Sequence, residues 1–288
     1  MRTQLNELAI ISFLIASTAL SSGTERFVSL SGAHVPPFTS WPEAATNIQE
    51  AIDASVSGDL IWVTNGVYAS GGKVMAGDLT NRVALDKPLT VQSVNGPSET
   101  IIQGGWDTNT NGPLAVCCAW LTNGAVLKGF TLQGGATRTN GGSALQSGGG
   151  VWGVSTQALV TGCWIFTNAA AADGGGSFQV ALSRCKVIGN RANQGGGAAN
   201  GAVKSSFIAK NVAVTYGGGS YECDLSNCTI NENTAQFFGG GGVRAFSSTT
   251  RNSILYGNLP MMPSLSTEYS GSSFNIKYCC IYLVPGSG

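Results

Sequence analysis

The chain has 288 residues, and its 15 basic and 15 acidic side chains cancel to a net charge of zero. This balance gives no electrostatic reason to expect a nucleic acid or an anionic membrane as partner, and 43% hydrophobic residues argue against a disordered chain. Glycine is the outlier, with 41 residues and no strict G-X-Y period, which excludes collagen and indicates another repeating structure.

The first 22 residues have the pattern of a secretory signal peptide. Arg2 precedes an apolar run that ends at Leu20, and the small residues at 19–23 are where we expect cleavage. The alternative is a membrane anchor, but the run is shorter than the ~20 residues that a helix needs to cross a bilayer. We therefore expect a secreted or cell-surface protein, with one domain over residues 23–288 and no membrane span in the mature chain.

Residues 26–58 are predicted to form a strand and an amphipathic helix that covers the open end of the fold. Ser40 and Glu43 have the spacing of a capping box, and Gly58 would end the helix. Apolar residues recur at helical spacing on one face: Ala45, Ile48 and Ile52. The stretch LIWVTNGVYA that follows is typical of two strands joined by an Asn-Gly turn, and irregular coils are expected over residues 59–145.

Residues 146–258 repeat with a period of about 22 residues. Tracts of three glycines begin at positions 148, 174, 195, 217 and near 240. A column of asparagines keeps the same phase: Asn168, Asn190, Asn211, Asn233 and Asn258. An aliphatic residue lies three positions before each asparagine, and a small residue lies five before it: Cys163, Cys185, Ser206, Cys228 and Ser253. Because these columns keep one phase, the repeat is structural.

The alternation of the aliphatic and small columns is strand spacing with one buried face. Each repeat is too short for a helical hairpin, and its glycines would weaken helices. We therefore expect an all-β solenoid, a parallel β-helix of about ten coils stacked at ~4.8 Å, close to 50 Å long. The asparagines should occupy a left-handed turn position and bond from coil to coil. The glycines should permit a sharp bend and close stacking of backbone.

The predicted helix followed by GDLIWVTNGVY resembles the N-terminal cap and first coil of the pectin-lyase-like right-handed parallel β-helix superfamily. The glycine tracts that alternate with [ILV]-x-x-N are similar to the repeats of chlamydial polymorphic outer-membrane proteins. Together the two features resemble secreted bacterial β-helix repeat proteins over residues 26–285. The resemblance implies a right-handed solenoid with a capping helix. It implies no single activity, because this architecture includes lyases, hydrolases and adhesins.

The residues do not supply the catalytic sets of that superfamily. Its pectate lyases bind Ca²⁺ through clustered aspartates and use an arginine as base, whereas this chain has no Asp-Asp pair and a single histidine, His34. The best catalytic candidate is Glu222 with Asp224, which would share one face of a strand, and Arg244 about one coil further on. Two carboxylates are few for a calcium site. We expect no catalytic residue, cofactor or metal, and keep a polysaccharide lyase or glycoside hydrolase with Ca²⁺ as the alternative.

A candidate ligand-binding column follows the glycine tracts. The second residue after each tract is in turn Trp152, Phe178, Ala199, Tyr221 and Arg244. This column should face outward and form an exposed strip, beside a lane of bare glycine backbone in which a polymer could lie. Such rings can stack on sugars; the alternative is that they only stabilise the fold. We expect a non-catalytic, adhesin-like role toward a polysaccharide or cell-surface glycan, with contacts from Trp152, Phe178, Tyr221 and Arg244.

Three of the eight cysteines hold equivalent inward positions in the repeat: Cys163, Cys185 and Cys228. Stacked coils would allow disulfides between them, but we favour free buried thiols. Two adjacent pairs have no assigned role: Cys117 with Cys118, and Cys279 with Cys280. Residues 259–288 lose the repeat and are expected to be irregular, which leaves open whether the solenoid continues beyond them.

Overall fold

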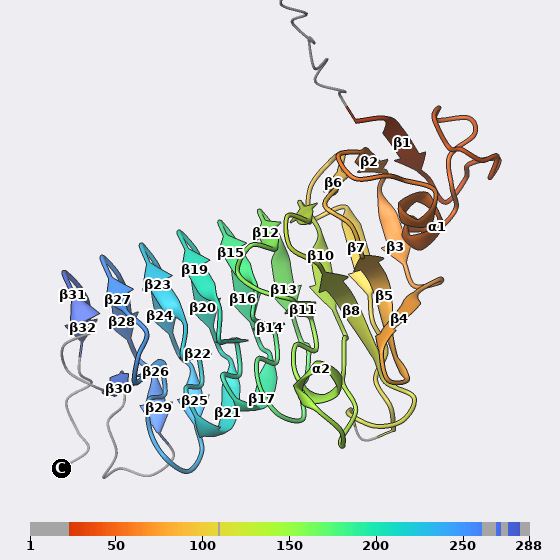
Figure 1. Cartoon of the computed structure of the whole chain (residues 1–288). Helices are drawn as coiled ribbons and strands as arrows, with labels where there is room; N and C mark the ends of the chain where they lie inside the picture. The colour runs from red at the N-terminus through yellow and green to blue at the C-terminus, as the bar shows by residue number, and fades with distance from the viewer. Residues whose placement is uncertain (1–22, 109, 261–268, 272–275, 283–288) are drawn as a thin grey trace, which may run out of the picture.

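The computed structural model describes residues 23–108, 110–260, 269–271 and 276–282. The predicted signal peptide lies outside these residues. The described chain is almost entirely β-structure, wound into a right-handed parallel β-helix whose coils follow one another along a single axis (Figure 1). No helix in the described part of the chain is long and apolar enough to cross a membrane.

Successive coils build three long sheets, A, B and C, and a short sheet D. The ten strands of sheet A are β1 Glu25–Val28, β2 Leu60–Val63, β6 Thr90–Ser93, β9 Val126–Lys128, β12 Leu159–Thr161, β15 Ala181–Ser183, β19 Ala202–Lys204, β23 Asp224–Ser226, β27 Thr250–Arg251 and β31 Ile276–Lys277. The nine strands of sheet B are β3 Gly66–Tyr68, β7 Thr100–Gln103, β10 Thr131–Gln133, β13 Trp164–Phe166, β16 Lys186–Ile188, β20 Phe207–Ala209, β24 Thr229–Asn231, β28 Ile254–Tyr256 and β32 Cys280–Tyr282.

Along the coils that contain a strand of sheet D, sheet C lies between sheets D and A. Its nine strands are β4 Lys73–Ala76, β5 Leu79–Leu85, β8 Val116–Leu121, β11 Val151–Gly153, β14 Ser177–Phe178, β18 Ala198–Ala199, β22 Ser220–Tyr221, β26 Val243–Ala245 and β30 Tyr269–Gly271. The four strands of sheet D are β17 Arg191–Gln194, β21 Val212–Tyr216, β25 Thr234–Ala235 and β29 Leu259–Pro260. Strands pair in parallel with the next coil, and the β4–β5 hairpin is antiparallel. The C-terminal segment that we expected to be irregular thus still adds strands to each sheet.

A short helix, α1 (Ile48–Asp53), covers the N-terminal end of the solenoid, and a second, α2 (Ser143–Gln146), lies within a long loop (Figure 1). Asn47 caps α1, because its side-chain oxygen accepts a hydrogen bond from the Glu50 amide at 3.0 Å. The face turned to the core is fully buried at Ile48, Ala51 and Ile52. The predicted capping helix is therefore present.

The helix begins later than the capping-box pattern predicts. Ser40 and Glu43 do meet, since the Ser40 hydroxyl donates to the Glu43 carboxylate at 2.9 Å. However, the chain after Glu43 is extended: the Ala45 amide donates to the Phe27 carbonyl at 2.9 Å, and Ala45 forms a parallel bridge with Val28. The predicted start at Ser40 is wrong because the backbone near Ala45 pairs with β1, and an extended segment in such a pairing cannot be helical.

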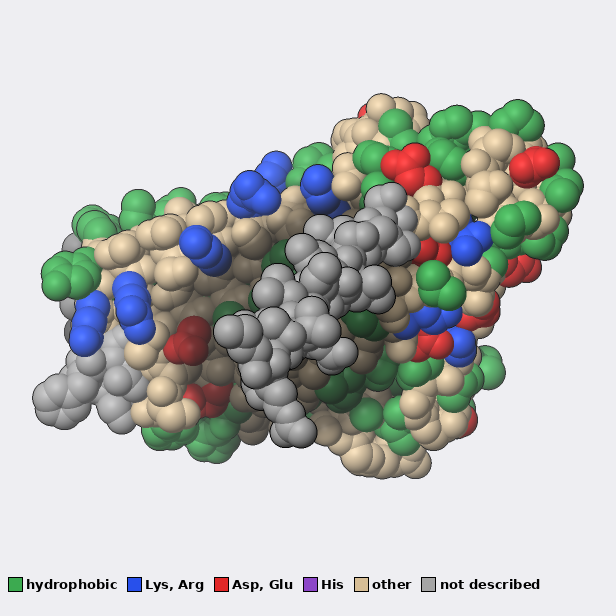
Figure 2. All heavy atoms as spheres, turned by 45° about the horizontal axis from the view of Figure 1, so that its top comes forward, with side chains coloured by type: hydrophobic (Ala, Val, Ile, Leu, Met, Phe, Trp, Pro, Cys, Tyr) green, Lys and Arg blue, Asp and Glu red, His purple; other side chains and the backbone are tan. Residues whose placement is uncertain are grey.

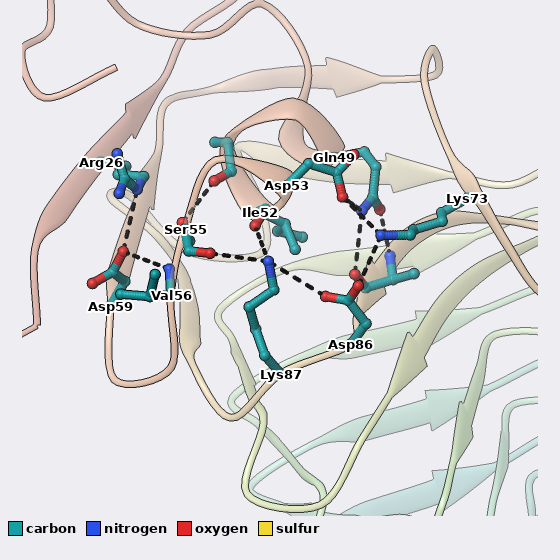
Figure 3. A network of polar contacts seen from close by, with 12 residues as sticks. Arg26, Gln49, Ile52, Asp53, Ser55, Val56, Asp59, Lys73, Asp86 and Lys87 are labelled. Atoms are coloured by element: carbon teal, nitrogen blue, oxygen red, sulfur yellow. Dashed lines mark hydrogen bonds and ion pairs between the residues drawn. The ribbon is translucent and has the colours of Figure 1, made fainter. Parts of the chain in front are cut away.

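Side chains fasten α1 to the first coils (Figure 3). The Gln49 side-chain oxygen accepts from the Ala84 amide at 2.7 Å, and its amide nitrogen donates to the Ala84 carbonyl at 3.3 Å. Lys87 Nζ donates to the carbonyls of Ile52 and Ser55, each at 3.0 Å, at the C-terminal end of the helix. These bonds satisfy backbone groups that would otherwise lack partners, at the edge of a strand and at the end of the helix.

The interior is built from in-register columns of apolar side chains. On sheet B one column runs through β13, β16, β20, β24 and β28, and every member is fully buried: Ile165, Val187, Ile208, Ile230 and Leu255. The small residues two positions earlier also lie inward and in line, as predicted: Cys163, Cys185, Ser206, Cys228 and Ser253. Burial raises the pKa of the Cys185 thiol to about 11, which makes it a poor nucleophile.

The asparagines form a continuous ladder after sheet B: Asn168, Asn190, Asn211, Asn233 and Asn258. The side-chain oxygen of Asn190 accepts from the backbone and side-chain amides of Asn168, at 2.9 and 3.0 Å, and the Asn190 side-chain amide donates to the Ile165 carbonyl at 2.9 Å. The ladder is confirmed, but the left-handed position is not. It falls one residue earlier, as at Thr167 with φ 52°, and this turn directs the next side chain into the ladder.

Candidate functional site

The predicted aromatic column lies on sheet C in strict register. Pairing runs from β8 to β26 through Trp120, Trp152, Phe178, Ala199, Tyr221 and Arg244. The preceding residue in each strand is buried in the core, so the column faces outward, as the alternation predicts. The sequence analysis did not include Trp120, because it precedes the first glycine tract.

The column is packed more closely than an exposed strip. Trp152 stacks on Trp120 with ring centroids 5.8 Å apart and planes 11° apart, and on Phe178 at 6.4 Å and 24°. Phe178 is only 4% exposed, while Trp152 and Tyr221 are half-buried. The expectation of a fully exposed strip is therefore wrong, because neighbouring rings one coil apart cover each other.

The expected lane of bare glycine backbone is also wrong. All three glycines of each tract are buried. The first is left-handed, as at Gly195 with φ 60°. At the second, a Cβ on Gly196 would lie 2.4 Å from the Val212 carbonyl oxygen of the next coil. The glycines therefore allow the bend and the close stacking that we predicted, but the neighbouring coils cover them.

A second outward column, which the sequence analysis missed, lies beside the rings. It consists of the residue before three successive tracts, and pairing places Asp173, Gln194 and Tyr216 in line. Tyr216 stacks on Tyr221 of sheet C at 6.4 Å. Burial raises the pKa of the half-buried Asp173 carboxyl. The sequence does contain a signal for this column, because a position that is polar in some repeats and aromatic in others is typical of an outward face.

Arg244 is held between rings rather than free at the end of a strip. Its guanidinium carbon lies 3.9 Å from the Phe246 ring centroid and 4.8 Å from that of Tyr216. Its Nη1 donates to the Ser270 hydroxyl. Phe246 is 53% exposed, so this end of the column presents an aromatic surface with a cation inside it.

The alternative catalytic cluster does not assemble. Glu222 is a left-handed turn residue with φ 49°, whereas Asp224 begins β23, so the two do not share a strand face. The Glu222 carboxylate accepts from the amides of Phe246 and Ser247, at 2.6 and 3.1 Å. Asp224 accepts from the Thr249 amide at 2.8 Å. The expectation of a shared face is wrong because a turn separates β22 from β23, and both carboxylates are used to hold the next coil.

A groove of about 580 Å³ runs over the outer face of sheet A, across β12, β15, β19, β23 and β27. Its floor is made by small side chains, among them Ala181 and Ala202. Three cations line it: Arg184, Lys204 and Arg251. Figure 2 shows Lys and Arg side chains in a row on this face, beside a hollow. The groove crosses successive coils, so an extended ligand in it would lie along the solenoid axis.

The cations belong to an outward column in parallel register: Lys128, Thr161, Ser183, Lys204, Ser226, Arg251 and Lys277. Arg184 follows this column by one residue, and its Nη2 donates to the Thr161 hydroxyl at 3.5 Å. Among the described residues, none of the basic side chains of this row makes an ion pair. The one acidic residue that lines the groove, Asp224, is engaged by Thr249.

No group of three or more metal-binding side chains occurs in the described ranges of the chain. The adjacent pair Cys117 and Cys118 is buried in β8, and burial raises the pKa of Cys118 to about 12. The remaining adjacent pair differs, since Cys280 is exposed at the last described coil. None of these thiols is placed in the groove or in the aromatic column.

No known family model and no curated protein matches the sequence. Solved structures with a similar course of the chain include the pectin methylesterase PemA from Erwinia chrysanthemi, at 8% identity and a TM-score of 0.48, with 91% of each chain covered. Pectate lyase Pel9A is 12% identical with a TM-score of 0.47, and the match covers 89% of this chain and 78% of the lyase. The Dettilon tailspike protein is 10% identical with a TM-score of 0.46, covering 91% of this chain and 48% of the tailspike.

Proposed function

We propose that this protein is a non-catalytic binding protein for an anionic polysaccharide, which lies along the groove over sheet A. The observation that supports this most strongly is the row of basic side chains without ion-pair partners. Lys204 and Arg251 are two coils apart in one column, roughly 10 Å at strand spacing. Several cations without ion-pair partners along one groove suit a polymer that carries carboxylates or sulfates.

The other side chains of the groove favour a sugar polymer over a nucleic acid. Hydroxyl groups lie between the cations, at Thr161, Ser183 and Ser226, and these can bond to sugar hydroxyls. None of the described residues that line the groove is aromatic, whereas single-stranded nucleic acids are generally held by stacking of bases on rings. Three cations are also few for a phosphate backbone.

The accessible part of the aromatic column belongs to the same proposal as an additional contact surface. Trp152 and Tyr221 are half-buried and can still offer ring edges, and Arg244 adds a cation beside the exposed Phe246 ring. Phe178 is buried and is a contact only through its support of Trp152. The groove remains the principal site because its cations have no ion-pair partner among the described residues.

The alternative function is a polysaccharide lyase or hydrolase, with Ca²⁺ for a lyase. It would need a carboxylate or arginine free to act on substrate. Glu222 and Asp224 are occupied by backbone amides, and Arg244 lies between two rings. Asp173 is the carboxyl whose pKa is raised, but it lies beside sheet C and not in the groove. These observations favour binding without cleavage.

We further infer that the protein acts outside the cell. This rests on the signal-peptide pattern of residues 1–22 and on the resemblance of the glycine tracts to those of polymorphic outer-membrane proteins. An adhesin-like role at a cell surface follows from the same two features. A rigid solenoid with its binding groove parallel to its axis is suited to hold a long, extended chain.

The test is equilibrium binding to polygalacturonate, with EDTA present, compared with the same polymer fully methyl-esterified. The wild type should bind the anionic polymer and not the neutral one. Each of Arg184→Gln, Lys204→Gln and Arg251→Gln should weaken binding by about two- to fivefold, as expected for an exposed ion pair. Arg191→Gln is the matched control, because Arg191 is exposed outside the groove and should leave binding unchanged.

Equal binding of both polymers, or equal losses in the control, would overturn the groove as the site. A parallel assay without EDTA and with added Ca²⁺ should show no unsaturated product from polygalacturonate. Product that disappears in Asp224→Ala or Arg244→Ala would establish the lyase instead.

A further inference from the structure

A separate pocket of about 410 Å³ lies on the outer face of sheet B, over the earlier coils. It is lined by Gln103, Trp106, Gln133, Gly134 and Thr167, and shares no residue with the groove over sheet A. Its volume falls within the ~300–1,000 Å³ range of small-ligand sites. None of its lining residues in the described part of the chain is charged. Its chemistry is therefore different from that of the basic groove.

One wall of the pocket is an exposed indole. Trp106 is 53% exposed although it is a large apolar side chain. The backbone holds it on both sides, because Gly105 and Val116 exchange hydrogen bonds at 2.9 and 2.8 Å, and the Asp107 amide donates to the Thr110 carbonyl at 3.1 Å. The ring is thus presented by a firmly bonded turn.

The Asp107 carboxylate next to this ring is directed elsewhere. It accepts from the amides of Leu114 and Thr108, at 3.0 and 2.6 Å, and these hydrogen bonds lower the pKa of Asp107. The carboxylate is therefore used to order the loop, which leaves the pocket neutral.

The floor of the pocket is a pair of glutamine side chains from adjacent coils. Gln103 and Gln133 are in register on β7 and β10, and the Gln133 amide nitrogen donates to the Gln103 side-chain oxygen at 2.8 Å. Gly134 makes this possible, since a Cβ there would lie 2.4 Å from the Gln103 amide nitrogen. The bond between the two amides orders both side chains.

Within the described residues, this pairing leaves one amide nitrogen and one amide oxygen without a hydrogen bond, whichever way the two amides are turned. The exposed Thr167 also lines the pocket and adds a hydroxyl group. A donor, an acceptor, a hydroxyl and one apolar ring thus line the same pocket. A pyranose has the matching surface, with C–H bonds on one face and hydroxyls around its edge.

We propose that this pocket binds a single neutral pyranose residue, which stacks on Trp106 and exchanges hydrogen bonds with the Gln103–Gln133 pair. The site does not rest on the proposed function, because the two surfaces share no residue and recognise different chemistry. It would recognise an uncharged sugar, either alone or as a branch on a longer glycan. A charged sugar would find no partner for its carboxylate here.

The test is titration of the full chain with methyl β-D-glucopyranoside and methyl β-D-galactopyranoside, followed by ligand-observed NMR. At least one should bind with a Kd in the region of 1 mM, the range of a single weak contact. Trp106→Ala should weaken binding about fivefold to tenfold, and Trp106→Phe should restore part of it. Trp41→Ala is the matched control, because Trp41 is 41% exposed but lies outside the pocket.

Gln133→Leu supplies an independent variant that leaves the ring in place. It should abolish binding of both glycosides while leaving the tryptophan emission spectrum of the protein unchanged. Absence of binding by the folded wild type, or binding that survives both Trp106→Ala and Gln133→Leu, would overturn the proposal. Retained binding in Gln133→Leu alone would show an apolar site and overturn it equally. None of these outcomes bears on the binding of polygalacturonate by the groove.

Discussion

The asparagine ladder shows how a single side chain can join two coils. Each ladder amide accepts two hydrogen bonds from the preceding coil and donates to a carbonyl, so that the buried polar atoms of Asn190 are fully satisfied. A buried amide that loses its partners costs more than the bond itself contributes, because the desolvation cost remains. The ladder is therefore a source of cooperativity between coils.

Replacing Asn190 with leucine should lower the free energy of unfolding by about 1–3 kcal/mol, since Asn168 and Asn211 would each lose a partner. Chemical denaturation monitored by circular dichroism measures the change. Asn193→Leu is the control, because Asn193 is half-buried three residues further on and outside the ladder. Equal losses in both variants would show that leucine is disfavoured in this segment for other reasons.

Asp173 predicts a pH dependence of stability. Burial raises the pKa of its carboxyl, so the native state binds the proton more tightly than the unfolded state does. The penalty for charging Asp173 is absent below the ordinary Asp pKa of 3.8 and complete once the pH exceeds the raised value. Asp173→Asn should therefore raise the melting temperature at neutral pH, by about 1–3 °C, and the gain should vanish in acid.

Thermal scans of the wild type and Asp173→Asn across this pH range measure the effect. Glu232→Gln, at a residue 53% exposed in its side chain, is the control and should show no comparable gain. A lower melting temperature for Asp173→Asn at neutral pH would mean that the carboxylate is stabilised by a contact, contrary to the prediction.

At the scale of the coil, the glycine tracts decide how closely neighbouring turns can approach. The second glycine of each tract faces backbone of the next coil, so its missing Cβ is a requirement of stacking. The same close approach moves the tracts out of solvent and lets the outward rings of sheet C lie against one another.

Gly196→Ala should lower the free energy of unfolding by at least ~1–3 kcal/mol, because its Cβ would lie 2.4 Å from the Val212 carbonyl oxygen and backbone cannot move aside cheaply. Gly142→Ala is the matched control: no atom lies within 4 Å of its added Cβ and its φ is negative. Denaturant unfolding of the two variants compares them. A tolerated Gly196→Ala would mean that the coils can separate locally at this point.

The ring column of sheet C gives a second prediction for an element. Phe178→Ala should lower the melting temperature clearly, because the ring is 4% exposed and supports Trp152. Tyr221→Ala should do so less, since Tyr221 is half-buried and Tyr216 remains stacked on Phe238 at 5.1 Å. Thermal unfolding, together with binding of polygalacturonate, separates the two roles. A loss of binding in Tyr221→Ala without a loss of stability would favour a direct contact.

For the whole molecule, the zero net charge conceals an uneven distribution. Residues 128–288 contain ten of the 15 basic residues but five of the 15 acidic ones, and the first 127 residues have the reverse. The acidic excess lies in and near the N-terminal coils, while the later coils present the basic row. A neutral chain can therefore still offer a groove in which basic side chains outnumber acidic ones.

Binding of polygalacturonate should accordingly fall steeply with salt. The screening length shrinks from about 30 Å at 0.01 M to about 8 Å at 0.15 M, so several exposed cations lose much of their attraction together. We expect the affinity to drop at least about tenfold over this range. Titrations at both ionic strengths, with the triple Gln variant of the groove cations as reference, measure the slope. An affinity that is independent of salt would point to stacking on the rings instead.

Much of the fold could be predicted because the regular coils repeat the same pattern of apolar, small and asparagine residues. The columns that include Ile165, Cys163 and Asn168 recur in phase, and the need to bury one strand face and pair each amide leaves a parallel solenoid as the consistent solution. The capping helix was predictable from its apolar face. The first residue of the helix was not predictable, because Ala45 pairs with Val28 of β1. That contact joins residues that are far apart in the sequence.

The sites depended on tertiary structure for the same reason. The sequence by itself determined that Trp152 and Tyr221 face outward, because alternation in a strand is a local property. Their exposure was decided by what lies one coil away, as was the turn that separates Glu222 from Asp224. The basic groove and the Trp106 pocket also arise only when coils stack, since the side chains that line them come from different repeats. Local periodicity determines which face a side chain occupies, whereas its neighbours from other coils determine what it can bind.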